Sequence, residues 1–108
     1  ALGVAAAENI VVVTGHQAEA VEDELRPFGV RVVRQLQQKG TGHAVECTRE
    51  LLESGEGLVM VLYGDTPLLS TRTLRLLVET HRKSQAGATL ISTTLENPHG
   101  YGRIVRDE

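Results

Sequence analysis

The six residues 58–63, Leu-Val-Met-Val-Leu-Tyr, constrain the fold more than any other stretch of the chain. They are apolar without alternation, so they predict a strand that is covered on both faces, as a central strand of a parallel sheet is. The sequence Gly-Asp-Thr-Pro at 64–67 ends this strand, because glycine and proline favour turns. A sheet of this kind needs helices on both faces, and the rest of the chain must supply them.

Strand and helix patterns alternate along the remaining sequence. We expect further strands at 9–14, 30–34 and 88–95, a short strand that closes the chain, and helices at 17–28, 42–53 and 70–84. Ser70 is the expected N-cap of the last helix. Alternation with short links is typical of parallel βαβ units. The predicted fold class is therefore α/β, a three-layer Rossmann-like fold with a mostly parallel sheet.

Composition limits the partners. The 108 residues include 11 Lys and Arg against 14 Asp and Glu, which gives a net charge of −3. Non-specific nucleic-acid binding relies on a concentrated basic face, so we expect no nucleic-acid partner. The apolar stretches are too short to span a bilayer, so we expect no membrane partner. The single cysteine, Cys47, allows no internal disulfide, which is the pattern of a reducing compartment, and we expect a cytoplasmic location.

Three polar loops that contain glycine, at 35–42, 64–67 and 97–102, are candidates for one ligand cleft. In open α/β sheets, ligands bind at the carboxyl ends of the strands, and the first two loops follow strands directly. The third loop lies between two expected strands. Arg103, just after it, is either a phosphate contact or a surface residue of the last strand.

Asp65 stands just past the most apolar strand, where an unpaired buried carboxylate would be costly. Mg²⁺ is usually held by one or two carboxylates together with phosphate oxygens. Asp65 is therefore a candidate metal ligand. The alternative is an aspartate that only caps the turn at Thr66 and Pro67.

The loop at 35–42 offers groups that suit a nucleotide base. Gly40 and Gly42 allow a ligand to approach the backbone closely, and Thr41 places a hydroxyl near a helix start. The side-chain amide of Gln35 can donate and accept in one plane, which matches a pyrimidine edge with an acceptor beside a donor. The alternative is a polar loop that only leads into a helix.

The four histidines show no spacing typical of metal ligands. They are His16, His43, His81 and His99. We expect them to be structural or surface groups.

Taken together, the three loops resemble those of the N-acetylglucosamine-1-phosphate uridylyltransferases, within the sugar-1-phosphate nucleotidyltransferase family. The resemblance covers nearly the whole chain, and in bacteria this activity forms the N-terminal domain of a bifunctional protein. The matching stretches are Thr14-Gly15-His16, Gln35 with Gly40-Thr41-Gly42-His43-Ala44, Tyr63-Gly64-Asp65-Thr66-Pro67-Leu68, and Gly100-Tyr101-Gly102-Arg103-Ile104.

The resemblance implies a reaction. The phosphate of N-acetylglucosamine 1-phosphate would attack the α-phosphorus of UTP, giving UDP-N-acetylglucosamine and pyrophosphate with Mg²⁺ assistance, as a step of cell-envelope precursor synthesis. Gln35 and the Gly40 backbone would recognise the uracil, and Thr41 would lie against the nucleoside.

The resemblance also implies the remaining site residues. Asp65 would bind Mg²⁺ and act as the catalytic residue. Tyr63 and Gly64 would line the sugar-nucleotide cleft, and the Gly102 backbone would contact the acetamido sugar.

The resemblance further implies parts that this chain does not contain. Members of the family begin with a strand and a glycine-rich loop with an arginine, followed by a lysine, and nothing similar precedes Ala1. We expect residues 1–108 to be an internal fragment, a partial nucleotidyltransferase domain that is inactive alone. Its parent would be a homotrimer through a β-helix domain absent here. Without the first strand, the sheet would have an unpaired apolar edge prone to self-association.

Two alternatives stay open. The first is a nucleotidyltransferase of the same fold that acts on another sugar 1-phosphate or uses another base. The second is a non-catalytic module that binds nucleotide sugars.

Overall fold

The structure is a computed structural model that describes residues 1–53 and 55–106. The chain divides into two compact units, one over Ala1–Leu74 and the other beginning at Arg75, and each is described by itself. Among the described residues, no helix has the length and apolar character needed to cross a membrane.

The first unit contains a parallel pair of strands. β1 (Val11–Thr14) lies beside β2 (Arg31–Arg34), with Val11 opposite Arg31 and Thr14 opposite Arg34. The ladder continues past both ends, because the Arg31 N–H donates to the Ile10 carbonyl at 3.0 Å and the Gln35 N–H donates to the Thr14 carbonyl at 2.7 Å. The strands expected at 9–14 and 30–34 are therefore confirmed, and so is their parallel pairing. Both are rich in valine, whose branched side chain suits a strand.

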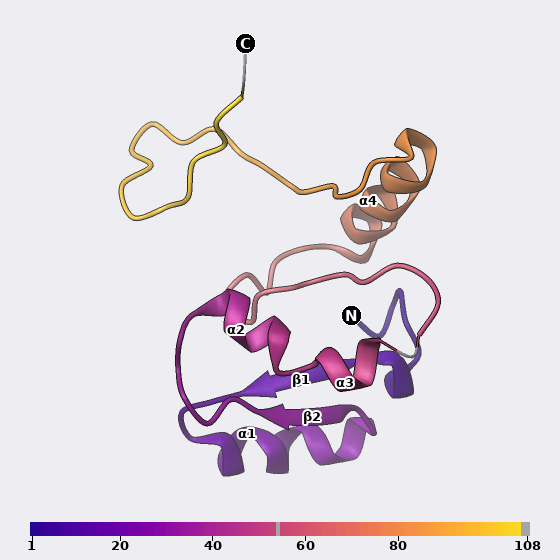
Figure 1. Cartoon of the computed structure of the whole chain (residues 1–108), viewed down its shortest axis with the longest axis vertical. Helices are drawn as coiled ribbons and strands as arrows, with labels where there is room; N and C mark the ends of the chain where they lie inside the picture. The colour runs from indigo at the N-terminus through magenta and orange to yellow at the C-terminus, as the bar shows by residue number, and fades with distance from the viewer. Residues whose placement is uncertain (54, 107–108) are drawn as a thin grey trace. The chain divides into compact units, whose positions relative to one another are not determined.

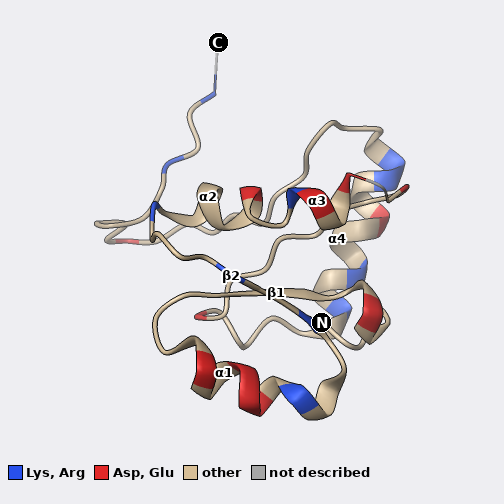
Figure 2. Cartoon of the chain, turned by 60° about the horizontal axis from the view of Figure 1, so that its bottom comes forward, with Lys and Arg blue, Asp and Glu red and all other residues tan. Residues whose placement is uncertain are grey.

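Helices lie on both sides of this strand pair. The crossover from β1 to β2 consists of α1 (Ala18–Leu25) and the 3-10 turn η2 (Arg26–Phe28), which Gly29 ends at φ +65°. Figures 1 and 2 show α1 on one side of the strands and the two short helices α2 (Thr41–Glu46) and α3 (Arg49–Leu52) on the other. One further 3-10 turn, η1 (Ala7–Asn9), leads into β1.

The single helix expected at 42–53 is wrong, because the structure has two helices there. Thr48, which is 5% exposed, lies between them, and its hydroxyl donates to the Val45 carbonyl at 2.6 Å. A threonine side chain that bonds a nearby carbonyl in this way competes with the helical hydrogen-bond ladder. The helix is therefore interrupted at Thr48, where the buried hydroxyl donates to a backbone carbonyl instead of to water.

The strand expected at 58–63 is also wrong for the described chain, where the sheet consists of β1 and β2. Leu58, Val59, Val61, Leu62 and Tyr63 are between 38% and 61% exposed. A strand forms only when a neighbouring strand satisfies its N–H and C=O groups, and none of the described residues pairs with this segment. The expected strands at 88–95 and at the end of the described chain are absent from residues 85–106 for the same reason. What is established is an α/β chain with a two-stranded parallel sheet.

The helix expected at 70–84 is confirmed as α4 (Thr71–Ser84), which begins in the first unit and continues in the second. Its start has the expected cap, because the Ser70 hydroxyl oxygen accepts a hydrogen bond from the Thr73 N–H at 3.1 Å. Within the second unit, the His81 ring nitrogen Nδ1 lies 2.9 Å from the Thr89 hydroxyl, which ties the end of α4 to the segment that follows it.

Candidate functional site

Gln35 lies at the carboxyl edge of the strand pair, directly after β2. Its backbone N–H is fixed by the Thr14 carbonyl of the neighbouring strand. The loop after Gln35 then returns to the end of β1, where a methyl group on Gly15 would come within 3.2 Å of the Gln38 side-chain nitrogen. The loops that follow β1 and β2 therefore meet at one edge of the sheet, which is the edge where α/β proteins bind ligands.

The side chain of Gln35 is held inside this loop. Its nitrogen Nε2 donates to the Gly40 carbonyl at 3.1 Å and lies 2.8 Å from Nδ1 of His43, in the first turns of α2. Gly40 itself has φ +95° and ψ 178°, and Thr41, the first residue of α2, is exposed. The structure thus brings together Gln35 and Gly40, two of the predicted site residues, and adds His43 to them.

The geometry changes what Gln35 can offer a ligand. We expected an amide that would both donate and accept toward a base. Its nitrogen is engaged by Gly40 and His43, and Oε1 is the part of the amide that the described residues leave without a hydrogen bond. Gln35 therefore presents an acceptor.

His43 was missed as a site residue, because the expectation was a structural or surface group. It is half-buried and one of its ring nitrogens contacts the Gln35 amide. A signal was present in the sequence, since His43 stands three residues after Gly40, on the first turn of the helix that the loop enters. The spacing alone did not indicate which side chain His43 contacts.

Asp65 lies in an exposed turn after the apolar segment. The turn is closed by Thr66, whose N–H and hydroxyl donate to the Tyr63 carbonyl at 3.3 and 3.1 Å. These hydrogen bonds do not involve the Asp65 side chain, which has no hydrogen bond or ion pair among the described residues. Tyr63 and Gly64 are exposed beside it. Within residues 1–53 and 55–74, no hydrogen bond joins this turn to the Gln35 loop.

The described residues contain no group of three or more His, Cys, Asp or Glu side chains that could hold a metal ion. A complete protein cage for a cation is therefore not present in them. Asp65 fits a different arrangement, because Mg²⁺ is often held by one or two carboxylates and completes its shell with phosphate oxygens and water. An exposed carboxylate without a partner can supply one such oxygen ligand.

The second unit contains the loop with Gly102. The Arg103 guanidinium nitrogen Nη1 donates to the carbonyls of Pro98 and Tyr101 at 2.6 and 2.7 Å, and Gly100 has φ +82°. The Tyr101 N–H also donates to the Pro98 carbonyl at 3.1 Å. Arg103 thus fixes its own loop, a role that neither sequence interpretation included, and Gly102 is exposed.

Arg34, the residue before Gln35, is anchored to α1. Its Nε and Nη2 atoms donate to the two carboxylate oxygens of Glu22 at 2.6 and 2.7 Å, and the Thr14 hydroxyl adds a bond of 3.4 Å. The hydrogen bonds from Arg34 lower the pKa of Glu22, and the same bonds raise the pKa of Arg34. This bidentate pair holds the end of β2 against the helix, and so it fixes the strand end from which Gln35 extends.

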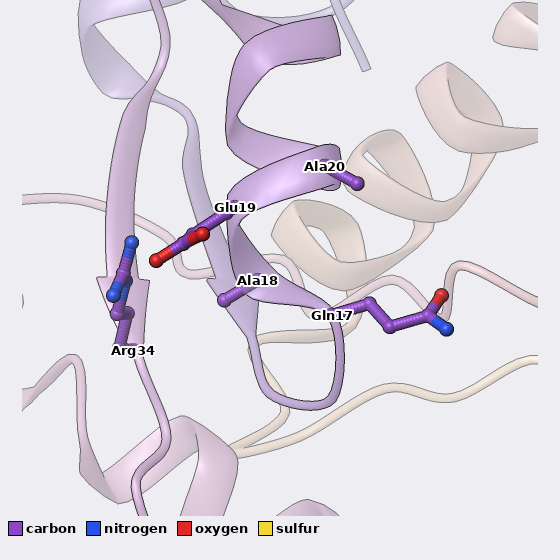
Figure 3. A pocket seen from close by; sticks show the side chains of 5 residues that line it. All are labelled: Gln17, Ala18, Glu19, Ala20 and Arg34. Atoms are coloured by element: carbon purple, nitrogen blue, oxygen red, sulfur yellow. The ribbon is translucent and has the colours of Figure 1, made fainter.

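A shallow hollow lies beside this pair, lined by Gln17, Ala18, Glu19, Ala20 and Arg34 (Figure 3). The figure shows the side chains of Glu19 and Arg34 pointing toward one another and that of Gln17 pointing away. The guanidinium of Arg34, the cation of this hollow, already pairs with the Glu22 carboxylate. Acidic residues also cover much of α1 (Figure 2). None of the predicted site residues lines this hollow, so we do not assign the site to it.

Known proteins resemble the whole chain. Residues 1–106 match the model of the MobA-like NTP transferase domain. The chain is 48% identical over 107 residues to the bifunctional protein GlmU of Solibacter usitatus (strain Ellin6076), which covers 99% of this chain and 23% of that protein. It is 49% identical over 102 residues to the bifunctional protein GlmU of Alkaliphilus metalliredigens (strain QYMF), with 94% of this chain and 22% of that protein covered.

A third relative gives the same result. The bifunctional protein GlmU of Synechococcus sp. (strain CC9605) is 48% identical over 101 residues, covering 93% of this chain and 22% of that protein. The chain thus spans less than a quarter of the length of these curated relatives. The resemblance drawn from the loops, to the N-terminal domain of a bifunctional bacterial protein, is confirmed.

Proposed function

The chain belongs to the family of MobA-like NTP transferase domains, and from this premise we propose that it is the uracil-binding part of a sugar-nucleotide-forming enzyme. The parent protein would transfer UMP from UTP to N-acetylglucosamine 1-phosphate, giving UDP-N-acetylglucosamine and pyrophosphate for cell-envelope precursor synthesis. The observation that carries this proposal is the Gln35 amide, fixed at the carboxyl edge of two parallel strands with its oxygen left to a ligand.

Uracil matches the groups at this edge. Its ring N3–H lies between two carbonyl groups, so it needs an acceptor flanked by donors. Gln35 offers the acceptor through Oε1, and the backbone of Gly40, which has no side chain, offers close approach to a base carbonyl. Thr41 lies against the nucleoside in this arrangement.

Asp65 is the proposed catalytic residue. As a carboxylate it would hold Mg²⁺, which when bound neutralises charge on the reacting phosphates. Its exposure and its lack of a partner among the described residues leave both carboxylate oxygens for that purpose. Tyr63 and Gly64, next to it in the turn, would line the sugar-nucleotide cleft.

The chemical step needs no covalent bond to the protein. An oxygen of the sugar phosphate attacks the α-phosphorus of UTP, the bond from that phosphorus to the β-phosphate bridging oxygen breaks, and pyrophosphate leaves with the electron pair. The protein contributes position and charge complementarity, which supply most of the catalysis in reactions of this kind.

The second unit would contribute to sugar recognition. Arg103 holds the loop that contains Gly102 through the carbonyls of Pro98 and Tyr101. A loop fixed in this way can present the Gly102 backbone to the acetamido group, because its shape does not have to be formed on binding.

The parent would also complete the sheet. The apolar run 58–63 is exposed in the described chain, and burying it between strands and helices of a three-layer Rossmann-like domain would remove that apolar surface from water. We include in the proposal that the parent is cytoplasmic and homotrimeric, and that the isolated chain does not catalyse the reaction.

The test is pyrophosphate release from UTP and N-acetylglucosamine 1-phosphate in the presence of Mg²⁺. In a full-length protein that contains this segment, Asp65→Ala should lower kcat by about 100-fold or more, since charge stabilisation at the phosphates is lost. Glu56→Ala, another exposed acid, is the matched control and should leave kcat unchanged. Full activity of Asp65→Ala would contradict the catalytic assignment, and transfer by the isolated chain would contradict its expected inactivity.

A further inference from the structure

The Gln35 amide has only one orientation that satisfies its neighbours. The Gly40 carbonyl oxygen can only accept a hydrogen bond, so the amide atom 3.1 Å from it must be the nitrogen Nε2. If the amide were turned over, its oxygen would face that carbonyl at close range, and two acceptors would repel each other. The position of Gly40 therefore fixes the nitrogen on the inner side of the loop.

The same nitrogen determines the state of His43. Nε2 of Gln35 carries two hydrogens and no free lone pair, so it can only donate. Nδ1 of His43, 2.8 Å away, must then be the acceptor. An imidazole that accepts at Nδ1 is neutral and carries its hydrogen on Nε2.

A second group approaches the same ring nitrogen. The sulfur of Cys47, the residue directly after α2, lies 4.0 Å from Nδ1 of His43. A thiol is a weak donor, and its distance is much longer than that of the amide nitrogen. The amide of Gln35 is therefore the partner that decides the orientation of the ring.

We infer that His43 is a positioning residue, which holds the Gln35 amide with Oε1 toward the ligand and thereby selects a base whose ring nitrogen carries a hydrogen. This inference rests on the proposed role of Gln35 in binding uracil. Both amide hydrogens are used by Gly40 and His43, so only an acceptor faces the base. The N3–H of uracil donates to it, whereas N3 of cytosine has a lone pair there and is repelled.

His43 thus acts through Gln35 and does not touch the nucleotide. Without an acceptor at position 43, the Gly40 carbonyl would still hold one hydrogen of the Gln35 amide, but the other hydrogen would be free to donate to a ligand. Such an amide would serve cytosine as well as uracil. The expected consequence is a change in base preference, which a purely structural histidine would not produce.

Two variants of His43 distinguish a role in positioning the Gln35 amide from a purely structural role. In His43→Asn, a side-chain carbonyl can replace Nδ1 as the acceptor, whereas His43→Leu has no acceptor at all. His16→Leu, at an exposed histidine outside the Gln35 loop, is the control. The probes are UDP and CDP, titrated into the 108-residue chain by calorimetry. The ¹⁵N chemical shifts of the His43 ring, measured at about pH 8 without nucleotide, report its tautomer directly.

The wild-type chain and His43→Asn should bind UDP more tightly than CDP. In His43→Leu, the ratio of the affinity for UDP to the affinity for CDP should fall by about five- to tenfold, which is the effect of one hydrogen bond. The ring shifts should show a neutral imidazole with its hydrogen on Nε2. A hydrogen on Nδ1 of His43 would overturn the inference, and this result does not depend on whether His43→Leu folds. An unchanged preference for UDP over CDP in a folded His43→Leu would overturn it as well. Binding of neither nucleotide, with the expected tautomer present, would overturn the proposed function instead.

Discussion

At the scale of single residues, Gly40 has the most restrictive conformation in the candidate site. Its φ of +95° with ψ 178° lies in a region that is almost confined to glycine. A Cβ atom there would meet nothing within 4 Å, so the cost of a side chain is conformational and not steric crowding. Gly40→Ala should therefore lower the free energy of unfolding by about 1–3 kcal/mol, measured by urea denaturation. It should also weaken nucleotide binding, because its carbonyl orients Gln35.

Gly42 provides the control for that substitution. It lies two residues further along, inside α2, and a Cβ atom there also meets nothing within 4 Å, but its φ is not positive. Gly42→Ala should be neutral or stabilise the chain by up to about 1 kcal/mol, since alanine favours helix. An equal loss of unfolding free energy in Gly40→Ala and Gly42→Ala would mean that the backbone conformation at Gly40 is not what makes its substitution destabilising.

Glu22 gives a prediction for the pH dependence of stability. Hydrogen bonds from Arg34 lower its pKa in the folded chain. At acid pH the unfolded chain therefore takes up the proton first, so stability rises with pH in this window. The contribution is fully present above the unfolded pKa of about 4.3 and is lost as the pH falls through the lower folded pKa. Glu22→Gln should be less stable than wild type at neutral pH and should lose less stability on acidification.

The measurement is the denaturation midpoint between about pH 2 and 7, which spans the titration of carboxyl groups. Glu24→Gln is the control, because Glu24 is exposed on the same helix and forms no ion pair with the residues that the structure describes. Its curve should run parallel to that of the wild type. If Glu22→Gln also ran parallel, the bidentate pair would not contribute to stability.

The residue scale also shows what the sequence could predict about the site. Gln35 and Gly40 lie in one loop, and the resemblance to the uridylyltransferases implied that both would recognise the uracil. The role of His43 could not be predicted, since it depends on a contact between two side chains and on which ring nitrogen accepts. The prediction that the Gln35 amide both donates and accepts toward a base was wrong in its donor part. The amide nitrogen has its partners inside the loop, and these side-chain contacts are not visible in the sequence.

At the scale of elements, local patterns predicted β1, β2, α1 and α4. Each has a signal within its own sequence, such as the valines of β1 and β2 or the Ser70 cap of α4. The run 58–63 has an equally strong apolar signal but forms no strand in the described chain. A strand needs a neighbour for its hydrogen bonds, and the presence of that neighbour is not a property of the local sequence.

The break between α2 and α3 leads to an element-scale prediction. Thr48 is 5% exposed and donates its hydroxyl hydrogen to the Val45 carbonyl. Thr48→Val keeps the shape but removes the donor, so the free energy of unfolding should fall by about 1 kcal/mol. Thr93→Val, at an exposed position of the second unit, is the control and should change stability by less than about 0.5 kcal/mol. No loss on Thr48→Val would show that the hydroxyl bond is not what stabilises the break.

At the scale of the whole molecule, the chain corresponds to only a part of each longer relative. The described residues contain the proposed base-binding loop and the exposed carboxylate of Asp65 in the first unit, and in the second unit the loop that Arg103 holds. Family membership extends over residues 1–106, whereas the chain covers less than a quarter of the GlmU relatives. We therefore propose that the reaction requires the longer parent, and that base recognition is the part of the function that this chain can perform alone.

The most direct test of that claim is an NMR titration of the chain with UDP-N-acetylglucosamine. We predict shift changes at Gln35, Gly40 and Thr41, and an affinity about tenfold lower in Gln35→Ala, which lacks the acceptor for the uracil N–H. Gln37→Ala, an exposed glutamine of the same loop, is the matched control and should bind as the wild type does. Unchanged affinity of Gln35→Ala, or shift changes that avoid this loop, would contradict the account.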